Sequence, residues 1–349
     1  MMTFHIVGMP QSLTTKAYSM CGFSQYTIRF CWMMKALGHK VYLYAGTENE
    51  AVCDEHVVCF TEEDRNNITE NSKHCAFPSW DSNHRTWIHT NNVVIQKIKE
   101  RKNNNNDFIC IIQGTCQRQI ADAFPELKTV EYSIGYEGFF SKWKVFETHA
   151  WRSYCVGRWL NSKDYLENHK FDNVIHGFFD PSEFTPNFDK KPYLFYVGRI
   201  NGAKGIVESV AAAKKAGILL KVAGAGDLSL IGDGAEYIGQ PTLQERNKIM
   251  AEATAVICPS KMFEPFNNVA CEAQLSGTPV ICTNWGGFTE TVEHEKSGFR
   301  CSTVQDMVNA ISRLNEIDNR YVLYRAVKMF SMKNKMYDYD KYFKGLLEV

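Results

Sequence analysis

The sequence predicts an α/β protein built from two doubly wound domains, and three observations carry this prediction. The chain has 349 residues, which is too long for one ordinary hydrophobic core and suits two domains of about 100–200 residues each. Short apolar runs alternate with helical periods, as in a parallel sheet covered by helices. That alternation stops at residues 180–192, which hold three prolines, and then starts again.

The first half is expected to hold a buried strand, a helix and a second strand before the pattern weakens. The helix is predicted over 24–40 because its apolar residues fall on one face, and Gly38 is placed at its C-terminal cap. Residues 47–107 are polar and harder to interpret, and 102–107 are predicted to be a solvated turn. The strands expected in this half are 4–9, 41–46, 108–114, 129–135 and 173–179.

The second half shows a regular strand–helix alternation after the proline-rich linker. The expected strands are 193–198, 219–224, 236–240, 255–260 and 279–283, and the expected helices are 205–217, 243–253 and 268–277. The predicted domains are therefore 1–182 and 183–325, with a last polar and aromatic segment, 326–349. Two such domains joined by a linker normally bind a ligand between them, at the carboxyl ends of strands.

Composition excludes several classes of function. The formal net charge is zero, so broad nucleic-acid binding is not indicated, although a local basic patch stays open. The twelve cysteines are scattered and form no C-x-x-C, which argues against a zinc ribbon or a thioredoxin site and predicts a reduced, cytoplasmic protein. No signal-peptide core and no run of 18 apolar residues is present. A membrane span is therefore not expected, and a peripheral membrane contact stays open.

Two cations follow the strand predicted at 193–198. Arg199 and Lys204 stand in a loop in which Gly202 and Gly205 keep the backbone open. A guanidinium that forks onto two oxygens and an ammonium point charge together suit a diphosphate. The alternative is a pair of surface cations in a turn, and the spacing is not that of a Walker motif.

Two carboxylates frame the stretch FEPFNNVACE, residues 263–272. Asn267 and Asn268 are good N-cap residues, so Glu264 is expected in a loop and Glu272 in the helix that follows. Backbone N–H groups at that helix start favour an anion. A helix carboxylate can accept two hydrogen bonds from a ribose diol, while the loop carboxylate reaches a sugar. Taken singly, each is more often a surface residue or a helix-start acid.

Four segments together resemble the nucleotide-sugar-binding half of glycosyltransferase family four. They are VGRINGAKG, VAGAG, CPSKMFEPFNNVACEAQLSGTPVI and NWGGFTETVEHEKSGF, and the resemblance covers about residues 190–303. It implies the GT-B fold, in which two Rossmann-like domains face each other across a cleft. It also implies that the first domain binds the acceptor, that the second binds the donor, and that the helix in 326–349 crosses back onto the first.

The resemblance carries roles onto individual residues. Arg199 and Lys204 match the pair that holds the donor diphosphate, Glu264 matches the glutamate that contacts the donor sugar, and Glu272 matches the one that binds ribose. The loop whose amides touch phosphate and sugar corresponds to Phe266, Asn267 and Asn268. The glycines expected on the donor side are Gly198, Gly224 and Gly22. The G-x-G formed by Gly224 and Gly226 is weak by itself and is also compatible with a tight turn.

The sequence departs from the family in two places. Where the family often has Phe-Gly, this chain has Phe266-Asn267, and asparagine tolerates positive φ better than most residues. Many relatives carry a histidine after a first-domain strand, and the matching position here is Gly135. Glu137 and His149 are the neighbouring residues that could approach the sugar, with a core or surface histidine as the simpler interpretation of His149.

The first half offers weaker predictions for the acceptor side. The early loop, residues 8–25, contributes Gly22, Phe23 and Ser24, and the QGTCQ stretch contributes Gln113 and Gln117 at a strand end. Aromatic faces suit the apolar faces of sugars, although such residues are more often core or interface. The tryptophans considered for such stacking are Trp80, Trp87, Trp143 and Trp151.

The function that this resemblance implies is a retaining, metal-independent glycosyl transfer from a nucleotide-diphosphate sugar to a hydroxyl-bearing acceptor. No cofactor is expected, and the donor base stays open between UDP, GDP and ADP. The DYD at 338–340 is interpreted as a solvated face rather than a metal site. Three alternatives stay open: a sugar-nucleotide epimerase, a nucleotide-sugar-binding protein without catalysis, and glycosylation of a modified base in nucleic acid.

Overall fold

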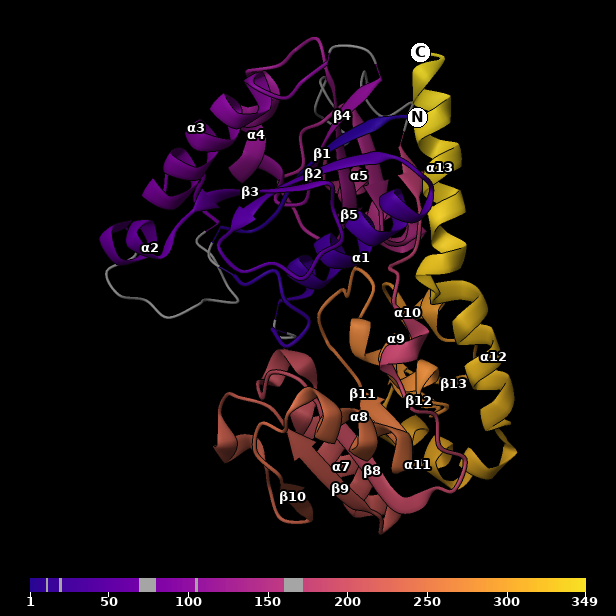
Figure 1. Ribbon diagram of the computed structural model, residues 1–349. Helices are drawn as coiled ribbons and strands as arrows, with labels where there is room; N and C mark the ends of the chain where they lie inside the picture. The colour runs from indigo at the N-terminus through magenta and orange to yellow at the C-terminus, as the bar shows by residue number, and fades with distance from the viewer. Residues whose placement is uncertain (11, 19–20, 69–79, 104–105, 160–171) are drawn as a thin grey trace. The chain divides into compact units, whose positions relative to one another are not determined.

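The computed structural model describes residues 1–349 except 11, 19–20, 69–79, 104–105 and 160–171 (Figure 1). The chain divides into two compact units. Unit 1 comprises Met1–Glu147, Tyr154–Phe178 and Met332–Val349. Unit 2 comprises Thr148–Ser153 and Phe179–Ser331.

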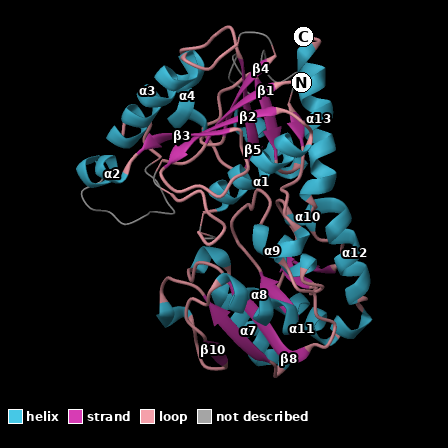
Figure 2. Ribbon diagram, in the orientation of Figure 1, coloured by secondary structure: helices cyan, strands magenta, loops and turns pink. Residues whose placement is uncertain are grey.

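Unit 1 is built on a seven-stranded sheet in which all pairs are parallel (Figure 2). Its strands are β1 (Thr3–Val7), β2 (Lys40–Gly46), β3 (Glu55–Phe60), β4 (Asp107–Ile111), β5 (Lys128–Ile134), β6 (Trp143–Phe146) and β7 (Asn173–Val174). They lie in the order β3-β2-β1-β4-β5-β6-β7. Parallel strands need crossover connections, and helices supply most of them.

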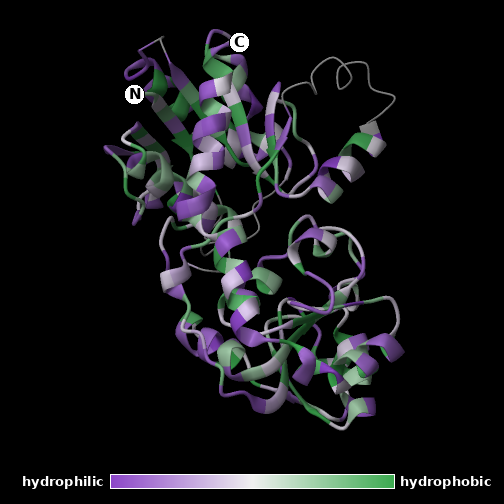
Figure 3. Cartoon of the chain, turned by 90° about the vertical axis from the view of Figure 1, so that its right-hand side faces the viewer, coloured by the Kyte–Doolittle hydropathy of each residue, from purple (hydrophilic) through white to green (hydrophobic). Residues whose placement is uncertain are grey.

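Helices cover both faces of this sheet. They are α1 (Gly22–Ala36), α2 (Glu62–Ile68), α3 (Arg85–Lys99), α4 (Arg118–Asp122), most of α5 (His149–Trp159) and α13 (Met332–Leu347). On one face Phe30 of α1 and Phe343 of α13 pack with Phe4 of β1. On the other, α3 and α4 close a second cluster over β2, β3 and β4. The hydropathy colours alternate along the helices, as expected of helices that bury only one side (Figure 3).

Unit 2 is built on a six-stranded parallel sheet. Its strands are β8 (Lys191–Val197), β9 (Leu219–Ala223), β10 (Ala235–Tyr237), β11 (Ala253–Cys258), β12 (Val280–Thr283) and β13 (Gly298–Cys301). The helices are α7 (Ile206–Ala216), α8 (Leu243–Glu252), α9 (Asn268–Leu275), α10 (Phe288–Thr291), α11 (Val304–Ser312) and α12 (Asn319–Phe330). One core lies under α7 and α11, and the other lies under α8 and α9.

The two sheets share one topology. Unit 2 has the order β10-β9-β8-β11-β12-β13, so in both units the third, second and first strands are followed by the fourth, fifth and sixth. The strand order reverses between β1 and β4 in unit 1 and between β8 and β11 in unit 2. In open α/β sheets, ligands bind outside the carboxyl ends of the strands at such a switch point.

The structure adds elements that the sequence analysis left out. Residues 47–107 contain β3, α2 and α3, and the four-residue strand β6 pairs with β5. The expected strand at 173–179 is reduced to β7, because Phe179 N–H instead donates to Phe330 O at 2.8 Å in unit 2. Gly38 has φ 78° just after α1 and serves as the predicted cap.

The boundaries of the units differ from the expected 1–182, 183–325 and 326–349. Residues 326–330 belong to α12, which packs in unit 2, and only α13 belongs to unit 1.

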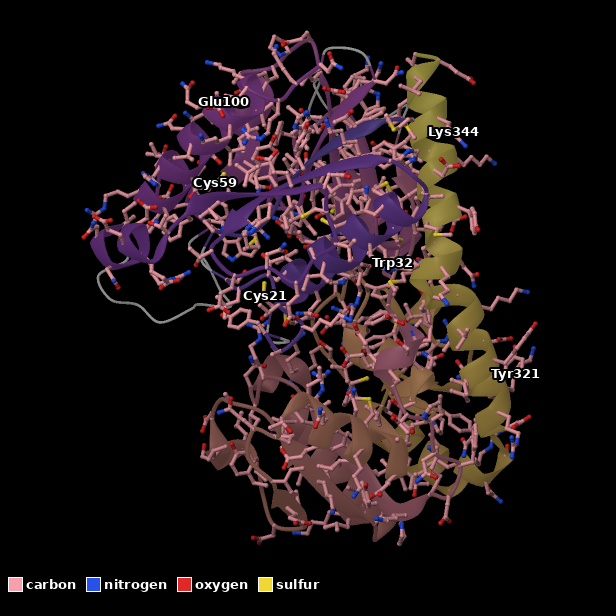
Figure 4. All side chains as sticks on the ribbon, in the orientation of Figure 1. Cys21, Trp32, Cys59, Glu100, Tyr321 and Lys344 are labelled. Carbon is pink, nitrogen blue, oxygen red and sulfur yellow. The ribbon has the colours of Figure 1, made fainter. Side chains whose placement is uncertain are left out.

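Lys344 points outward from α13, whereas Cys59 is buried in β3 (Figure 4). The described cysteines all carry free thiols, and Cys75 lies outside the described residues.

Candidate functional site

The loop that follows β8 packs directly on the loop that follows β11. Lys261 N–H donates to Ala203 O at 2.8 Å. Gly205 has φ 76°, and a side chain there would overlap the carbonyl of Pro259. Glycine is needed at this position for both reasons, since it alone adopts positive φ without strain and presents no Cβ. The close approach brings residues from the two loops to the switch point of unit 2.

Lys204 and Glu264 meet at this point. Lys204 Nζ lies 2.6 Å from Glu264 Oε1, and the side chains are 21% and 8% exposed. Such a short, largely buried, charge-assisted hydrogen bond fixes both groups. Asn201 Oδ1 accepts from Lys204 N–H at 2.9 Å and holds the backbone of the lysine. Two residues that the sequence analysis assigned to one ligand are thus direct neighbours.

A third loop supports Glu264 from behind. Gly287 N–H donates to Glu264 O at 2.7 Å. A Cβ on Gly286 would stand 2.8 Å from Glu264 O, and one on Gly287 would stand 2.6 Å from Pro265 O. Neither glycine was predicted to contribute to the site, although the Gly-Gly pair in NWGG is a usable signal for close backbone approach.

The segment 148–150 completes the support. Thr148 Oγ1 donates to Pro265 O at 2.6 Å. Glu290 accepts from His149 N–H at 3.0 Å and from Ala150 N–H at 2.7 Å. His149 is therefore exposed at the start of α5 in unit 2, on a backbone tied to the Glu264 loop. No sequence signal indicated that Thr148 and Glu290 would take part.

Helix α9 begins at Asn268, four residues after Glu264 in the sequence. Asn267 has φ 69°, as its departure from the family pattern required, and its Oδ1 caps Ala270 N–H at 3.0 Å. No acidic residue occupies the first turn of α9, so the positive end of the helix dipole is not neutralised from within the helix. Phe266 points the other way and packs with Phe179 and Phe330, which leaves only its backbone for a ligand.

Glu272 lies in α9 with its side chain 13% exposed. Its Oε2 stands 3.3 Å from Arg246 Nη2 as an ion pair, yet that oxygen makes no well-directed hydrogen bond within the described part of the chain. A carboxylate has about four acceptor positions, so Glu272 retains capacity for hydroxyl groups.

The glycines after β8 and β9 have a packing reason. Ile200 N–H donates to Ala225 O at 2.8 Å, and a side chain at Gly224 would overlap Gly198 O. Gly224 therefore holds two loops together, as the tight-turn interpretation of the G-x-G anticipated. Arg199 is exposed between them.

Arg325 braces α9 from α12. Its guanidinium donates to Gln274 Oε1 at 3.2 Å, to Thr291 O at 2.9 Å and to Glu290 O at 3.1 Å. Burial lowers the pKa of Arg325 from its ordinary value, and the nearby Glu293 carboxylate opposes that shift.

Burial raises the pKa of the Cys258 thiol well above its usual range, so this cysteine beside the site is no thiolate nucleophile.

Several predicted residues of unit 1 have structural partners. Gln117 was predicted for the acceptor side. Its Oε1 accepts from the N–H groups of Ile112 and Gln113, at 3.0 and 2.9 Å, so this oxygen is already hydrogen-bonded to the backbone. Ser24 Oγ is 2.5 Å from Ser12 Oγ and buried.

The other acceptor-side predictions have varied surroundings. Glu137 pairs with Arg158 at 3.1 Å and is 47% exposed. Gly22 is the first residue of α1. The early loop that precedes it includes Gln11, Ser19 and Met20, which lie outside the described residues.

The four tryptophans considered for sugar stacking differ in exposure and in contacts. Trp87 is fully buried, Trp151 contacts Phe263 with ring centroids 6.3 Å apart, and Trp80 is 50% exposed. Trp143 is half-buried beneath Lys142.

The DYD residues are on α13, where Asp338 pairs with Lys335. Asp340 is less solvated than expected, because it pairs with the buried His39 at 3.6 Å as well as with Lys344. Among the described residues no group of His, Cys, Asp or Glu is arranged to hold a metal ion. No described helix is long and apolar enough to span a membrane.

Part of unit 2 matches a known protein family in sequence. Residues 191–316 match the family model described as "Glycosyl transferases group 1". The chain is 32% identical over 124 residues to glycogen synthase of Mycobacterium tuberculosis (strain CDC 1551 / Oshkosh). That match covers 31% of this chain and 30% of the relative, so the chain spans about a third of the curated relatives' length.

Solved structures extend the likeness to the whole chain. AviGT4, a glycosyltransferase involved in avilamycin A biosynthesis, superposes with a TM-score of 0.70 at 18% identity, covering 100% of this chain and 98% of its own. The Anabaena protein HepE, in complex with UDP-glucose, gives a TM-score of 0.67 at 14% identity over 100% of both chains. These likenesses establish the fold: the chain has the GT-B architecture of two Rossmann-like units, as predicted.

Proposed function

We propose that this protein is a retaining glycosyltransferase of family four that moves a hexose-type sugar from a nucleotide-diphosphate donor to a hydroxyl-bearing acceptor. One observation carries the proposal. Lys204 and Glu264 are held 2.6 Å apart at the switch point of unit 2, on the loop that leads into the acid-free start of α9. A cation and a helix N-terminus suit a diphosphate, and a carboxylate beside them suits the sugar that it carries.

The donor is expected to lie along the loops that follow β8 and β11. Lys204 and Arg199 would meet the diphosphate oxygens, and the backbone at the start of α9 would add N–H donors. Glu272 would accept from the ribose hydroxyls, with Arg246 restraining its carboxylate at 3.3 Å. Glu264 would take sugar hydroxyls while holding Lys204 in position. The match of residues 191–316 to glycosyltransferases of group 1 supports this assignment.

Catalysis would come mainly from positioning and from stabilising the leaving group. Negative charge builds up on the nucleotide diphosphate as the glycosidic bond breaks, and a preorganised ammonium is worth more there than in water. The site is already assembled, because Lys204 is fixed by Glu264 and by Asn201, so little reorganisation is needed when the charge develops.

Retention follows if the acceptor attacks from the face that the diphosphate leaves. The departing phosphate oxygen can then take the acceptor proton, and no strong protein base is required. This suits a chain in which Gly135 stands where many relatives have a histidine. The donor base stays open between UDP, GDP and ADP.

The test is turnover of donor by the purified full chain. UDP-, GDP- and ADP-glucose are incubated with protein, released nucleotide is quantified, and the anomer of the first sugar released is read by proton NMR before mutarotation. We expect release from one donor, with the α anomer formed first. Binding without release of any nucleotide would favour a binding protein without catalysis, and an initial β anomer would overturn retention. Conversion of the donor to an epimeric nucleotide-sugar would favour the epimerase.

A further inference from the structure

Trp285 is exposed on the loop that follows β12 in unit 2, and it was not among the tryptophans considered for sugar stacking. It is 39% exposed, and Met262 and Phe263, on the neighbouring loop that follows β11, are 43% and 37% exposed. A single exposed apolar side chain is ordinary, whereas several that lie together mark a binding surface. The three side chains immediately precede residues of the candidate site, since Glu264 follows Phe263 in the chain.

Three hydrogen bonds tie the loop after β12 to the loop after β11, and each joins residues two positions further along both loops. The bonds run from Thr283 Oγ1 to Ser260 O at 2.8 Å, from Trp285 Nε1 to Met262 O at 3.1 Å and from Gly287 N–H to Glu264 O at 2.7 Å. The two loops therefore run side by side in a fixed register. Trp285 makes the middle bond, one step before the bond that holds Glu264.

This register fixes how far the indole lies from Glu264. Met262, the partner of Trp285, is two residues before Glu264, and an extended chain advances about 3.3 Å per residue. The strands that lead into the two loops are neighbours, and neighbouring strands lie about 4.8 Å apart. The backbones of Trp285 and Glu264 are therefore about 8 Å apart. One six-membered ring can contact both side chains across that distance.

The indole is held in one orientation. Its single N–H is already donated to Met262 O, and the following Gly286 and Gly287 pack closely on the backbone of Glu264 and Pro265. Because an indole has no other polar atom, its remaining exposed surface consists of carbon and C–H groups. Such a ring binds a ligand by stacking and not by hydrogen bonding.

The strand order places three kinds of side chain in a row along the edge of the sheet. Lys204 follows β8, Glu264 follows β11 and Trp285 follows β12, and these strands are consecutive neighbours. In the proposed donor complex the diphosphate meets Lys204 and the transferred sugar meets Glu264. The indole stands on the other side of Glu264 from the strand that bears Lys204, where the ring of that sugar extends away from the diphosphate.

The chemistry beside the indole favours a sugar ring over an alkyl chain. An alkyl chain would cover Trp285 and Met262 but would leave the neighbouring Glu264 carboxylate without a ligand. A pyranose uses both groups, because its C–H face stacks on an aromatic ring and its hydroxyls donate to a carboxylate.

We propose that Trp285 is a specificity-determining residue that stacks on the ring of the transferred sugar, beside the hydroxyls that Glu264 accepts. This inference rests on the proposed function, because it requires a nucleotide-sugar in unit 2. It adds the loop after β12 to the donor site. Because the indole is already fixed by its bond to Met262, little side-chain freedom is lost when the sugar binds.

The experiment separates the sugar part of the donor from its nucleotide part. Isothermal titration of the full chain measures the Kd of UDP, GDP and ADP, and of UDP-glucose, UDP-galactose, UDP-N-acetylglucosamine, GDP-mannose and ADP-glucose. The nucleotide-sugar that binds best is then titrated into Trp285→Leu. We expect its affinity to fall roughly three- to tenfold through loss of stacking, while the affinity of the matching nucleotide diphosphate stays the same.

Trp285→Phe is the matched control for loop support. Both variants lose the hydrogen bond to Met262 O, but only phenylalanine keeps an aromatic face. Trp285→Phe should therefore retain most of the nucleotide-sugar affinity. Tyr324→Leu, at a position 63% exposed on α12, should change neither affinity nor the Tm of the empty protein.

A second measurement does not depend on the leucine variant folding well. The wild-type protein is labelled with 5-fluorotryptophan, and the fluorine NMR signal of Trp285 is identified by its loss in Trp285→Phe. Addition of the nucleotide-sugar should shift this signal more than addition of the nucleotide diphosphate does. Equal shifts would show that the sugar does not reach the indole.

The outcomes distinguish this inference from the proposed function. The inference is overturned if Trp285→Leu leaves the nucleotide-sugar affinity unchanged, if it weakens nucleotide diphosphate and nucleotide-sugar equally, or if Trp285→Phe is as impaired as Trp285→Leu. In those cases the wild-type protein still binds its donor, and the proposed function stands. Failure of the wild-type protein to bind any nucleotide or nucleotide-sugar would overturn both.

Discussion

Unit 1 and unit 2 repeat one strand order, and in each a group of chemically active residues lies where that order reverses. The two groups of residues differ in their chemistry. The unit 2 site is charged, and Lys204 and Glu264 satisfy each other at 2.6 Å. In unit 1, a cavity lined by Phe23, Trp80, Gln113, Thr115, Cys116 and Gly135–Gly138 is largely aromatic, and the buried Gln113 amide has no hydrogen-bond partner within the described residues. One strand order thus places a charged cluster at the switch point of unit 2 and a largely aromatic cavity at that of unit 1.

The largest effect should come from removing the cation of unit 2. Lys204→Ala should lower donor turnover by roughly 10²–10³-fold, because one electrostatic contact to the developing charge is lost. Lys261→Ala is the control, since it removes the ion pair between the half-exposed Lys261 and Glu208 in the first turn of α7. Steady-state kinetics on both variants decides the matter, and equal turnover would remove Lys204 from the mechanism.

A glycine variant tests whether loop packing holds the charged site together. Gly205→Ala should destabilise unit 2 by about 1–3 kcal/mol from positive φ, and by more from overlap with Pro259. Gly202→Ala in the same loop meets nothing within 4 Å and should change stability little. Thermal unfolding of both variants gives the comparison. If the two Tm values agree, the close loop approach is not what positions Lys204.

Glu272→Ala should have a smaller effect, confined to binding. Losing the hydrogen bonds to a ribose should weaken the nucleotide-sugar by roughly 10–100-fold, through about 1–3 kcal/mol. Glu252→Ala, which breaks the ion pair to Lys191, serves as the control on the neighbouring helix α8. Isothermal titration measures both. Unchanged donor affinity in Glu272→Ala would reject the ribose assignment.

The smallest effect is expected at Asn267. Asn267→Gly keeps the positive φ of 69° and should cost only a few tenths of a kcal/mol. Asn267→Ala loses the cap on Ala270 N–H and strains the backbone, which should cost about 1–2 kcal/mol. Chemical denaturation resolves the two. Equal stabilities would mean that the asparagine cap contributes nothing to α9.

Part of the fold and part of the candidate site could be predicted from the sequence. The fold class and most elements of unit 2 follow from apolar runs bounded by glycine and proline. The contact between Lys204 and Glu264 joins two short segments, each next to a predicted strand. Strands β3 and β6 were missed because β3, EHVVCF, is a short edge strand that starts with two polar residues, and because β6 is only four residues long.

The sequence named several residues that line the unit 1 cavity, Phe23, Gln113 and Glu137 among them, but it could not predict that they line one cavity. Its lining comes from four segments far apart in the chain, around Phe23, Trp80, 113–116 and 135–138, and no local spacing joins them. The sequence pointed to both glutamines of QGTCQ, and in the structure Gln117 Oε1 accepts from the backbone N–H groups of Ile112 and Gln113. Choosing between two glutamines four positions apart requires knowing which one has partners. The supports from Thr148 and Glu290 depend on tertiary contacts in the same way.

The central claim is that unit 2 binds a nucleotide-sugar through Lys204, Glu264 and Glu272. The most direct measurement is a thermal-shift titration of the full chain with UDP-, GDP-, ADP- and dTDP-sugars, repeated on a Lys204→Ala/Glu272→Ala double variant. A donor at 100 times its Kd should stabilise the wild-type protein by about 2.7 kcal/mol, and the double variant should lose most of that gain. A response from none of the donors, or an equal response in the double variant, would contradict the account.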